Sequence, residues 1–320
     1  MLVSVVVPNL NKGCFLEQAL ESIFQQEYID VEVIAIDGGS NDCSLEVFEK
    51  YRDRFAAFIS EPDEGQANAI NKGFRLARGD VVAWLNSDDV YYPDAVSLAV
   101  AAFEDNPELD LLYGDGIFID EANRYLRPFT EVEPYSEYRL RNCSDYIMQP
   151  TTFFRRKALE EIGYIDEDLH FAFDWDLWCK LARHAGSVKY LPKYMAATRI
   201  YPDTKTSSGG WPRLREISQV LRRHRTGWWP PAYWGYLSTE LLSMQTNQPV
   251  MRRWSLWGVQ TACGFLAIEN VINHRKLTRG GRAVDEAVPN MLPAGVTMTY
   301  FKGDRGKLMP EQLRSQLLAQ

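Results

Sequence analysis

The stretch VEVIAIDGGSND, residues 31–42, passes from a mostly apolar run into an acidic turn that contains two glycines. Its first six residues have the length and the β-branched content of a buried strand, which Asp37-Gly38-Gly39-Ser40 ends. Two other stretches have the same order: Val3–Val7 before Pro8-Asn9, and Val81–Leu85 before Asn86-Ser87-Asp88-Asp89. The pattern predicts parallel strands, buried on both faces, with polar residues at their carboxyl ends.

Amphipathic helices are predicted between these strands. Apolar residues recur at helical spacing over residues 15–24, after a candidate N-cap at Asn11. Further helices are predicted at Leu45–Tyr51, at Gln66–Ala77 and after Pro93, and a third strand at Phe55–Ile59. This alternation predicts an α/β fold in which a Rossmann-like, mostly parallel sheet has helices on both faces.

Candidate site residues lie at the carboxyl ends of the predicted strands, where such sheets bind their ligands. They are Pro8-Asn9, Asp37, Glu61-Pro62-Asp63 and Asp88-Asp89. Each also has a structural interpretation, because Asp-Gly forms turns and Asn or Asp caps helices. Four such groups at one edge of a sheet favour a ligand site.

The composition is that of a chain with a large apolar core, since 46% of its 320 residues are hydrophobic. The five cysteines are scattered and form no C-x-x-C pair, which predicts neither a disulfide framework nor a zinc site and favours a reducing cytoplasm. The apolar N-terminal run is too short for a signal peptide or a membrane span. The four histidines lack metal-ligand spacing.

Charge is distributed unevenly along the chain. Residues 1–204 contain 19 Lys or Arg and 36 Asp or Glu, whereas residues 205–282 contain 12 and 3. This asymmetry predicts two parts, 1–204 and 205–320, of which the first suits metal ions and the second anionic surfaces.

Several motifs in residues 3–204 resemble the family 2 glycosyltransferases with the GT-A fold. They are VVVPN at 5–9, IDGGSND at 36–42, EPDEGQ at 61–66 with NKG at 71–73, and LNSDD at 85–89. QPTTFFRR at 149–156 and FDWDLW at 173–178 are similar to the acceptor-side strand and the base-bearing helix of that family. The resemblance implies transfer of a sugar from a nucleoside diphosphate to an acceptor hydroxyl.

The implied donor site needs a cation, because the leaving diphosphate concentrates negative charge that a hard divalent ion with oxygen ligands stabilises. The resemblance assigns Mn²⁺ or Mg²⁺ to Asp89 and the ribose or sugar to Asp88. It places the uracil and ribose of a UDP-sugar on Asp37 and Asp63, beside the backbone of Pro8 and Asn9. Gln66 belongs to the same donor-binding set, and Lys72 either contacts the base or phosphate or is simply exposed on its helix.

The resemblance also implies a general base. The acceptor hydroxyl loses its proton as it attacks the anomeric carbon, and a carboxylate is the usual acceptor of that proton. The matching position is Asp174, which could also be the N-cap of its helix, with Asp176 adding charge to the first turn, and both roles could hold together. A base opposite the leaving group implies inversion, so that an α-linked donor gives a β-linked product.

The chain departs from the family pattern after the last predicted strand. Many relatives have Arg-x-His there, with the His on the metal or diphosphate, whereas this chain has Arg199-Ile200-Tyr201. Arg199 remains in the donor-binding set. A phenol is a poor ligand for Mg²⁺ or Mn²⁺ because it stays protonated at neutral pH, so Tyr201 is predicted to hydrogen-bond a phosphate oxygen.

Residues 205–320 are predicted to form a basic, helical extension rich in Trp and Tyr. A helical cap on the core, a homo-oligomer interface and docking on an anionic membrane surface are all open, and no transmembrane helix is predicted. Membrane docking would suit a lipid-linked glycan acceptor in bacterial surface polysaccharide assembly and a position on the inner face of the cell membrane. A nucleic-acid partner is disfavoured because residues 1–204 are acidic.

Three functions from other classes are alternatives to glycosyl transfer. A sugar-nucleotide pyrophosphorylase would need a Gly-rich, basic loop after the first strand, and residues 9–13 are too sparse for one. A dinucleotide oxidoreductase would need G-x-G-x-x-G there, which is absent. A catalytically weak scaffold that binds nucleotide sugars is compatible with Tyr201, but Asp89 and Asp174 argue against it.

Overall fold

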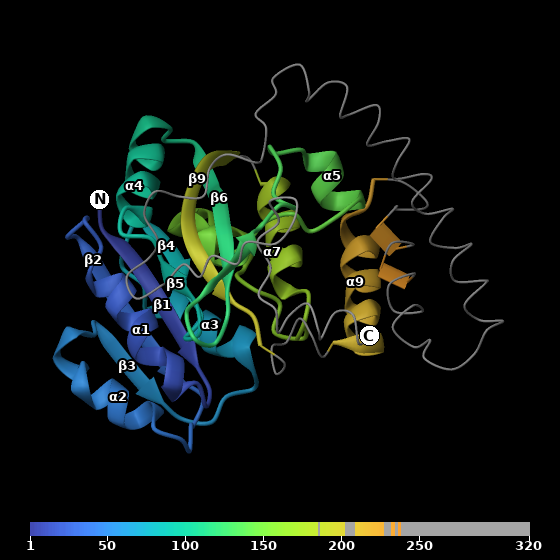
Figure 1. Ribbon diagram of the computed structural model, residues 1–320. Coiled ribbons are helices and arrows are strands. Elements are labelled where there is room, and N and C mark those ends of the chain that lie inside the picture. Colours follow the sequence, from blue (N-terminus) through green and yellow to red (C-terminus); the bar gives the residue numbers. More distant parts are fainter. Residues whose placement is uncertain (185, 202–208, 227–231, 234–235, 238–320) are drawn as a thin grey trace, which may run out of the picture.

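The computed structural model describes residues 1–184, 186–201, 209–226, 232–233 and 236–237, and the predicted alternation of strands and helices is present there (Figure 1). The first elements are β1 (Val3–Asn9), α1 (Gly13–Phe24), β2 (Val31–Asp37), α2 (Ser44–Lys50), a 3₁₀ turn (Arg52–Arg54), β3 (Ala57–Ser60), α3 (Gln66–Leu76) and β4 (Val81–Trp84). All of these strands are parallel and adjacent, in the order β3-β2-β1-β4. The predicted parallel arrangement is confirmed for this half of the sheet.

The predicted N-cap at Asn11 is wrong. Helix α1 begins at Gly13 after Lys12, while Asn11 has a positive φ of 54° and its side chain accepts a hydrogen bond from the Asn41 backbone N–H. The carboxylate of Asp42 instead accepts a hydrogen bond from the Gly13 N–H at 2.9 Å. The cap comes from a distant loop, which a search of the adjacent sequence does not reveal.

The sheet continues beyond β4 with strands of both directions. β8 (Phe153–Arg155) lies antiparallel between β4 and β6 (Leu109–Ile119), and β6 pairs in parallel with β9 (Ser187–Arg199). β5 (Val90–Tyr91) and β7 (Tyr125–Pro128) add antiparallel pairings to β9 and β6. The accompanying helical elements are α4 (Ala95–Asp105), α5 (Glu137–Asn142), a 3₁₀ turn (Gln149–Thr151), α6 (Arg156–Ile162), α7 (Phe173–Ala182) and α9 (Gly210–His224).

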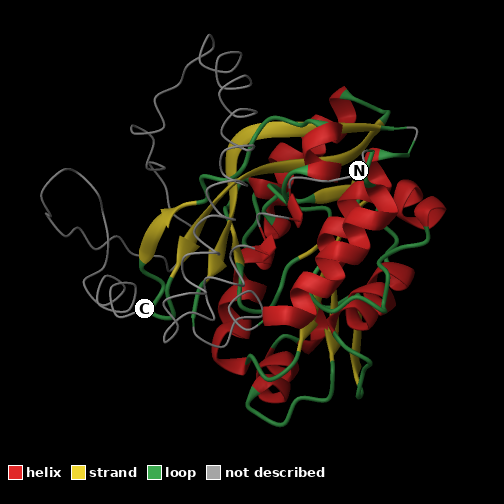
Figure 2. Ribbon diagram, turned by 90° about the vertical axis from the view of Figure 1, so that its right-hand side faces the viewer, coloured by secondary structure: helices red, strands yellow, loops and turns green. Residues whose placement is uncertain are grey.

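Two apolar cores lie on opposite faces of the sheet, and the helices that pack on it are drawn in red in Figure 2. Val5 and Val33 pack with residues of α1, α2 and α4, whereas Val6 and Ile34 pack with residues of α3, α6 and α7. Neighbouring residues of one strand point to opposite faces, which explains why these strands are apolar at most positions. The predicted α/β fold with helices on both faces is confirmed.

An aromatic stack fixes α7 on the sheet. Trp84 of β4, Phe154 of β8 and Trp178 of α7 lie nearly parallel, with ring centroids 5.5–5.7 Å apart. All three side chains are fully buried. Stacked and offset aromatic pairs add to the free energy gained by burial. They therefore fix the position of the helix beside the carboxyl end of β4.

Helix α9 lies beyond residue 204 yet packs on α7 (Figure 1), and Ile217, Val220 and Leu221 join the core that contains α7. The boundary between 204 and 205 stays a prediction. Residues 202–208, 227–231, 234–235 and 238–320, on which most of the interface and membrane-surface predictions depend, lie outside the described residues. Among the described residues, no helix combines the length and apolar character that a bilayer span requires.

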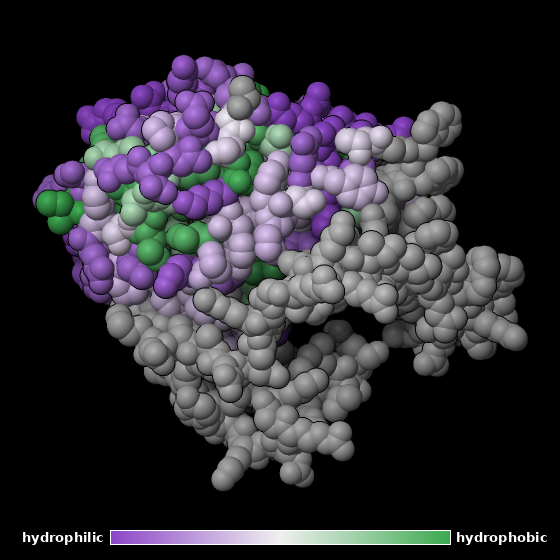
Figure 3. All heavy atoms as spheres, turned by 90° about the horizontal axis from the view of Figure 1, so that it is seen from above, coloured by the Kyte–Doolittle hydropathy of each residue, from purple (hydrophilic) through white to green (hydrophobic). Residues whose placement is uncertain are grey.

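The surface of the described residues is largely hydrophilic when seen from above, with apolar side chains in small areas between polar ones (Figure 3). Such scattered apolar residues are normal on a folded domain and do not by themselves mark a binding face.

His184, just after α7, joins two acidic residues from separate elements. Its ring nitrogens lie 2.6 Å from an Asp110 oxygen and 2.8 Å from a Glu161 oxygen. The hydrogen bond with Asp110, the larger cause, and that with Glu161 raise the pKa of His184.

Candidate functional site

The carboxyl ends of β1 and β2 bring Asn9 and Asp37 together, as predicted. The two residues are register partners, and the Asn9 amide donates to Asp37 Oδ1 at 2.9 Å. Asp37 is fully buried and also accepts hydrogen bonds from Ser40, Gly39 and Ser60. Burial opposes ionisation of Asp37, but the hydrogen bonds from Ser40 and Asn9 outweigh it and lower the pKa. Asp37 therefore organises the 38–40 turn, in which Gly39 has a φ of 84°.

Asp63 is placed beside this turn and has an oxygen available to a ligand. Its Oδ1 accepts the Gly65 N–H at 2.8 Å, and Oδ2 accepts no hydrogen bond within the described part of the chain. A Cβ atom at position 38 would lie 2.5 Å from Oδ2, so the carboxylate occupies the space that a side chain at Gly38 would take. The predicted donor-binding carboxylate thus lies over the end of β2.

Lys72, on α3, forms an ion pair of 2.7 Å with Glu61. Its side chain is 23% exposed, and its predicted contact with the base or phosphate of a donor stays a prediction. A negatively charged ligand would have to compete with Glu61 for it.

Asp88 and Asp89 differ sharply in environment. Asp89 is 2% exposed, and its two oxygens accept hydrogen bonds from the Arg199 backbone N–H and the Asn86 amide. Burial, followed by the charge of Asp88, raises the pKa of Asp89 well above its usual range. Asp88 is less buried, and only one of its oxygens accepts a hydrogen bond from a described residue. The more accessible carboxylate is therefore Asp88.

Tyr201 forms a hydrogen bond with the carboxylate of Asp88. Its hydroxyl donates to Asp88 Oδ2 at 2.6 Å, and burial followed by the Asp88 charge raises the pKa of Tyr201. The Tyr201 ring lies 5.4 Å from that of Phe15, and Lys12 Nζ is 4.6 Å from the Tyr201 ring centroid. Tyr201 thus orients Asp88, and its predicted contact with a phosphate oxygen stays a prediction.

Arg199 is a buried connector. Its guanidinium, on a residue 2% exposed, donates to the backbone oxygens of Asp88 and Asp120 and to the Gln18 side chain. Burial lowers the pKa of Arg199. The negative charges of Asp89 and Asp88 act in the opposite direction but do not outweigh burial. With these donors engaged by protein groups, Arg199 holds β9 against the Asp88-Asp89 turn, and its predicted direct contact with the donor stays a prediction.

The side-chain amides of Gln66, Asn86 and Gln149 form a chain of hydrogen bonds at this edge. Gln66 was a predicted site residue, whereas Asn86 and Gln149 were not. The Gln66 amide donates to Asn86 Oδ1 at 2.8 Å, and the Asn86 amide donates to Gln149 Oε1 at 2.9 Å. Gln149 in turn donates to the Trp84 carbonyl at 3.0 Å. Asn86 and Gln149 belong to the motifs LNSDD and QPTTFFRR that carry the family resemblance, and this membership is the signal in the sequence that could have indicated their role.

Asp174 is the second residue of α7, and its Oδ1 accepts the Trp175 N–H at 2.8 Å. The N-cap is Ala172, so the N-cap interpretation of Asp174 is wrong. The preceding side chain, Phe173, has its ring 6.5 Å from that of Trp84, at the end of β4. The first turn of α7 therefore lies beside the strand that leads to Asp88 and Asp89.

Asp145 is a second carboxyl near Asp174 that sequence reasoning did not find. Its Oδ1 is buried and has no hydrogen-bond partner within the described residues. Burial, followed by interaction with the Asp174 charge, raises the pKa of Asp145 well above its usual range, while Arg213 of α9 acts in the opposite direction. No local pattern marked this residue, because its neighbours come from other elements.

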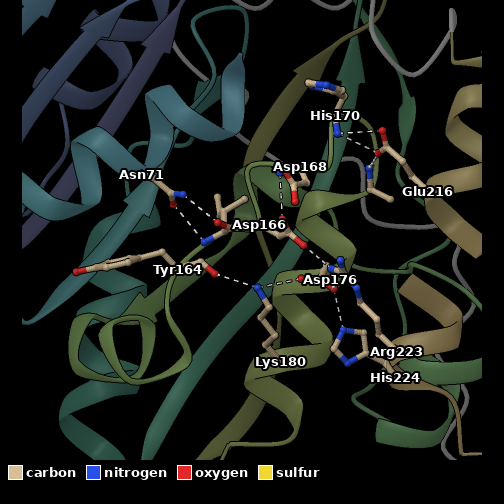
Figure 4. A network of polar contacts seen from close by, with 12 residues as sticks. Asn71, Tyr164, Asp166, Asp168, His170, Asp176, Lys180, Glu216, Arg223 and His224 are labelled. Atoms are coloured by element: carbon tan, nitrogen blue, oxygen red, sulfur yellow. Dashed lines mark hydrogen bonds and ion pairs between the residues drawn. The ribbon is translucent and has the colours of Figure 1, made fainter. Parts of the chain in front are cut away.

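Asp176 is in the first turn of α7, as predicted, but its carboxylate is fully buried in a charged network (Figure 4). Oδ1 lies 2.8 Å from His224 Nε2 and 3.4 Å from Arg223, and Oδ2 lies 3.0 Å from Lys180 Nζ. Burial would raise the pKa, but the hydrogen bond with His224 and the charge of Lys180 lower it. Asp176 holds α7 and α9 together.

The fold is an α/β fold in which carboxylates gather at the carboxyl ends of the parallel strands. Residues 4–163 match the family described as glycosyl transferase family 2, which is half of the chain. The protein therefore belongs to glycosyltransferase family 2 and is a glycosyltransferase.

Two relatives illustrate the range of the family. An uncharacterized glycosyltransferase of Rickettsia typhi is 25% identical over 232 residues, which cover 68% of this chain and 70% of that protein. Chondroitin synthase of Escherichia coli is 29% identical over 194 residues, 60% of this chain but only 28% of the synthase.

Two solved structures share the fold. Residues 1–349 of Staphylococcus aureus TarS, in complex with UDP, superpose with a TM-score of 0.60 at 20% identity, over 82% of this chain and 81% of that one. The mannosyltransferase PcManGT of Pyrobaculum calidifontis, in complex with GDP-Man and Mn²⁺, gives a TM-score of 0.55 at 18% identity, over 88% and 76%. The predicted GT-A fold is confirmed.

Proposed function

We propose that the protein is an inverting, metal-dependent glycosyltransferase that moves a sugar from a UDP-sugar to a hydroxyl of a glycan or lipid-linked glycan, in bacterial surface polysaccharide or glycolipid assembly. The observation that carries this proposal is the position of α7, which packs against the end of β4. The ring contact between Phe173 and Trp84 brings the first turn of α7, which contains Asp174, beside the strand that leads to Asp88 and Asp89. A base and a leaving-group site then share one edge of the sheet.

The donor would lie over the ends of β1 and β2. Asp63 has an oxygen that accepts no hydrogen bond from the described residues, and it lies against the turn that Asp37 organises. We assign the uracil and ribose to this place, with Asp63 as the direct contact and Asp37 as its support. The UDP in the TarS complex supports a uridine donor, and the name of chondroitin synthase supports a carbohydrate acceptor.

The residues present suit a divalent cation, with one change from the sequence prediction. Within the described residues no three His, Cys, Asp or Glu side chains cluster as a metal site, so diphosphate and water oxygens would complete the coordination. Both Asp89 oxygens already accept protein hydrogen bonds, whereas one Asp88 oxygen accepts none from the described residues. We therefore assign the direct metal contact to Asp88 and a supporting role to Asp89. When bound, Mn²⁺ or Mg²⁺ would supply positive charge to the departing diphosphate.

The transfer itself is a single displacement. Asp174 accepts the proton of the acceptor hydroxyl while that oxygen bonds to the anomeric carbon and the bond from this carbon to the diphosphate oxygen breaks. Attack from the face opposite the leaving group converts an α-linked donor into a β-linked product. Tyr201 donates a hydrogen bond to Asp88 Oδ2 and so orients this carboxylate at the donor site.

The test is nucleotide release from UDP-glucose, UDP-galactose, UDP-N-acetylglucosamine, UDP-glucuronate and GDP-mannose, with Mn²⁺ or with EDTA. Loss of a general base lowers turnover by about 10²- to 10⁴-fold, which is the effect expected of Asp174→Asn at unchanged UDP affinity. Asp168→Asn, an exposed residue before the same helix, is the control and should match the parent. Absence of release from every donor, or near-parental release by Asp174→Asn, would refute the proposal.

The metal assignment has its own test. Calorimetric titration with UDP, with and without Mn²⁺, should show that Asp88→Asn loses more of the Mn²⁺-dependent affinity than Asp89→Asn does. The reverse order would return the direct metal contact to Asp89, the residue that the family resemblance indicated.

A further inference from the structure

Helix α7 begins without a cap of its own. Its N-cap residue is Ala172, which has no side-chain acceptor, although the first backbone N–H groups of a helix need partners outside the helix. The N–H of the N-cap residue Ala172 is bound by Glu216, a residue of α9 that lies 44 positions further along the chain.

Glu216 binds three successive backbone N–H groups ahead of α7. Its Oε2 accepts hydrogen bonds from His170 at 3.0 Å, Phe171 at 2.6 Å and Ala172 at 3.1 Å, and Oε1 accepts a second one from His170 at 3.0 Å (Figure 4). Consecutive N–H groups that converge on one anion form a tight backbone cradle. The carboxylate also lies at the positive end of the α7 dipole, which favours its negative charge.

This cradle is directly connected to the proposed base. Asp174 follows Ala172 by two residues, and the Asp176 N–H donates to the Ala172 carbonyl at 3.0 Å to close the first turn. A displacement of Ala172 would therefore displace Asp174 with the whole turn. Within the first turn, the Asp174 side chain itself accepts the Trp175 N–H at 2.8 Å, so Glu216 acts on the residues just before the helix and not on the same N–H group.

The same two helices are joined at a second place, so Glu216 acts from a fixed support. Arg223 and His224, at the end of α9, both contact the buried carboxylate of Asp176. Ile217 and Val220 pack between these two places, in the core that contains α7. An anchor on a regular, packed element holds a group more accurately than one on a loop.

We propose that Glu216 is a positioning residue for the catalytic base: its carboxylate fixes the start of α7 and with it the placement of Asp174 toward the acceptor hydroxyl. The proposal rests on the assignment of Asp174 as base. Misplacement of a reacting group by about 1 Å costs on the order of 100-fold in rate, so loss of the anchor should lower kcat by roughly 10- to 100-fold and leave UDP affinity unchanged.

The variants separate hydrogen bonding from charge and from bulk stability. Glu216→Gln keeps one side-chain oxygen, which can occupy the position of Oε2 and accept the same three hydrogen bonds. Glu216→Ala and Glu216→Asp, which have shorter side chains, lose the contact. Ile217→Val loosens the adjacent packing without touching the cradle. Arg222→Ala changes an exposed α9 residue that donates a hydrogen bond to the Ser218 carbonyl in the same helix.

Hydrogen–deuterium exchange on the full-length protein gives a readout that needs no substrate. The amides of His170, Phe171 and Ala172 should exchange much faster in Glu216→Ala and Glu216→Asp, and at a near-parental rate in Glu216→Gln, Ile217→Val and Arg222→Ala. Unchanged exchange in Glu216→Ala would overturn the proposal.

Turnover with the best donor of the panel tests the catalytic consequence. The kcat should fall in Glu216→Ala and Glu216→Asp and be largely retained in Glu216→Gln. Added to Asp174→Asn, Glu216→Ala should lower the residual rate no further, because the two residues act through one group. A parental kcat in Glu216→Ala, or an equal loss in Ile217→Val, refutes the role of Glu216. A parental kcat in Asp174→Asn refutes the base assignment instead.

Discussion

Replacement of Asp176 by Asn should destabilise the protein without abolishing donor binding. The fully buried carboxylate lies within 3.4 Å of Arg223, 3.0 Å of Lys180 and 2.8 Å of His224. Asn keeps an oxygen for His224 but turns an amide N–H₂ group toward the Lys180 ammonium, so that two donors face each other. The change removes the negative charge and leaves the shape almost unaltered.

The magnitude follows from what the partners can do afterwards. Removing one partner of a fully buried ion pair costs about 3–5 kcal/mol, because the other charge is stranded. Here Lys180 keeps a hydrogen bond to the Tyr164 carbonyl and is 25% exposed, and Arg223 keeps Asp166 and is 37% exposed. The cost should therefore be nearer that of lost charged hydrogen bonds, about 2 kcal/mol. For a domain of about 200 residues this corresponds to a fall in Tm of roughly 4–8 °C.

Thermal unfolding by calorimetry at pH 7 measures this change, with Asp168→Asn as the matched control. Substitution of an exposed Asp should alter the unfolding free energy by less than about 0.5 kcal/mol. Because the pKa of Asp176 is lowered in the folded protein, its stabilisation is present above the unfolded pKa of about 3.9 and is lost as pH falls through the folded pKa. The difference in Tm between parent and variant should therefore shrink in acid. An unchanged Tm at pH 7, or a difference that grows in acid, would refute the reasoning.

Three further changes test other parts of the site and fold. Gly38→Ala should weaken UDP binding by about tenfold in calorimetry, equal to about 1.4 kcal/mol, because the new Cβ would lie 2.5 Å from Asp63 Oδ2 and displace it; unchanged affinity would place the nucleotide elsewhere. His184→Gln should lower Tm at pH 6 more than at pH 8, because the hydrogen bond with Asp110 raises the pKa of His184 and its stabilisation is lost as pH rises through that value; an equal loss at both would contradict it. Asp145→Asn should raise Tm at pH 7 and less so near pH 4, because burial raises the pKa of Asp145 and its ionisation above the unfolded pKa of about 3.9 opposes folding; a lower Tm at pH 7 would show that the carboxylate has a stabilising partner.

The sequence by itself determined the α/β fold and one edge of the site. Mostly apolar runs such as Val31–Ile36 are typical of strands in a parallel sheet that is covered on both faces, and residues that follow parallel strands must meet at one edge. The contact between Asn9 and Asp37 is therefore readable from their positions after β1 and β2. The family motifs also marked the Asp88-Asp89 pair as belonging to that edge.

Only the tertiary structure decided which members of that set are accessible. Adjacent residues such as Asp88 and Asp89 look equivalent in sequence, but the turn after β4 buries one of them against Arg199. Asp176 likewise reads as a first-turn charge until α9 closes over it with Arg223 and His224.

The cap of α7 shows why such roles cannot be read along the chain. A local cap leaves a signal within a few residues of the helix start, whereas Glu216 reaches the backbone of residues 170–172 from another helix. Nothing in the intervening sequence specifies that contact, because it depends on the crossing of α7 and α9 and on the packing of Ile217 and Val220 between them. Hydrophobic periodicity predicts that a helix has a buried face, and only the folded core determines which backbone that face brings within reach.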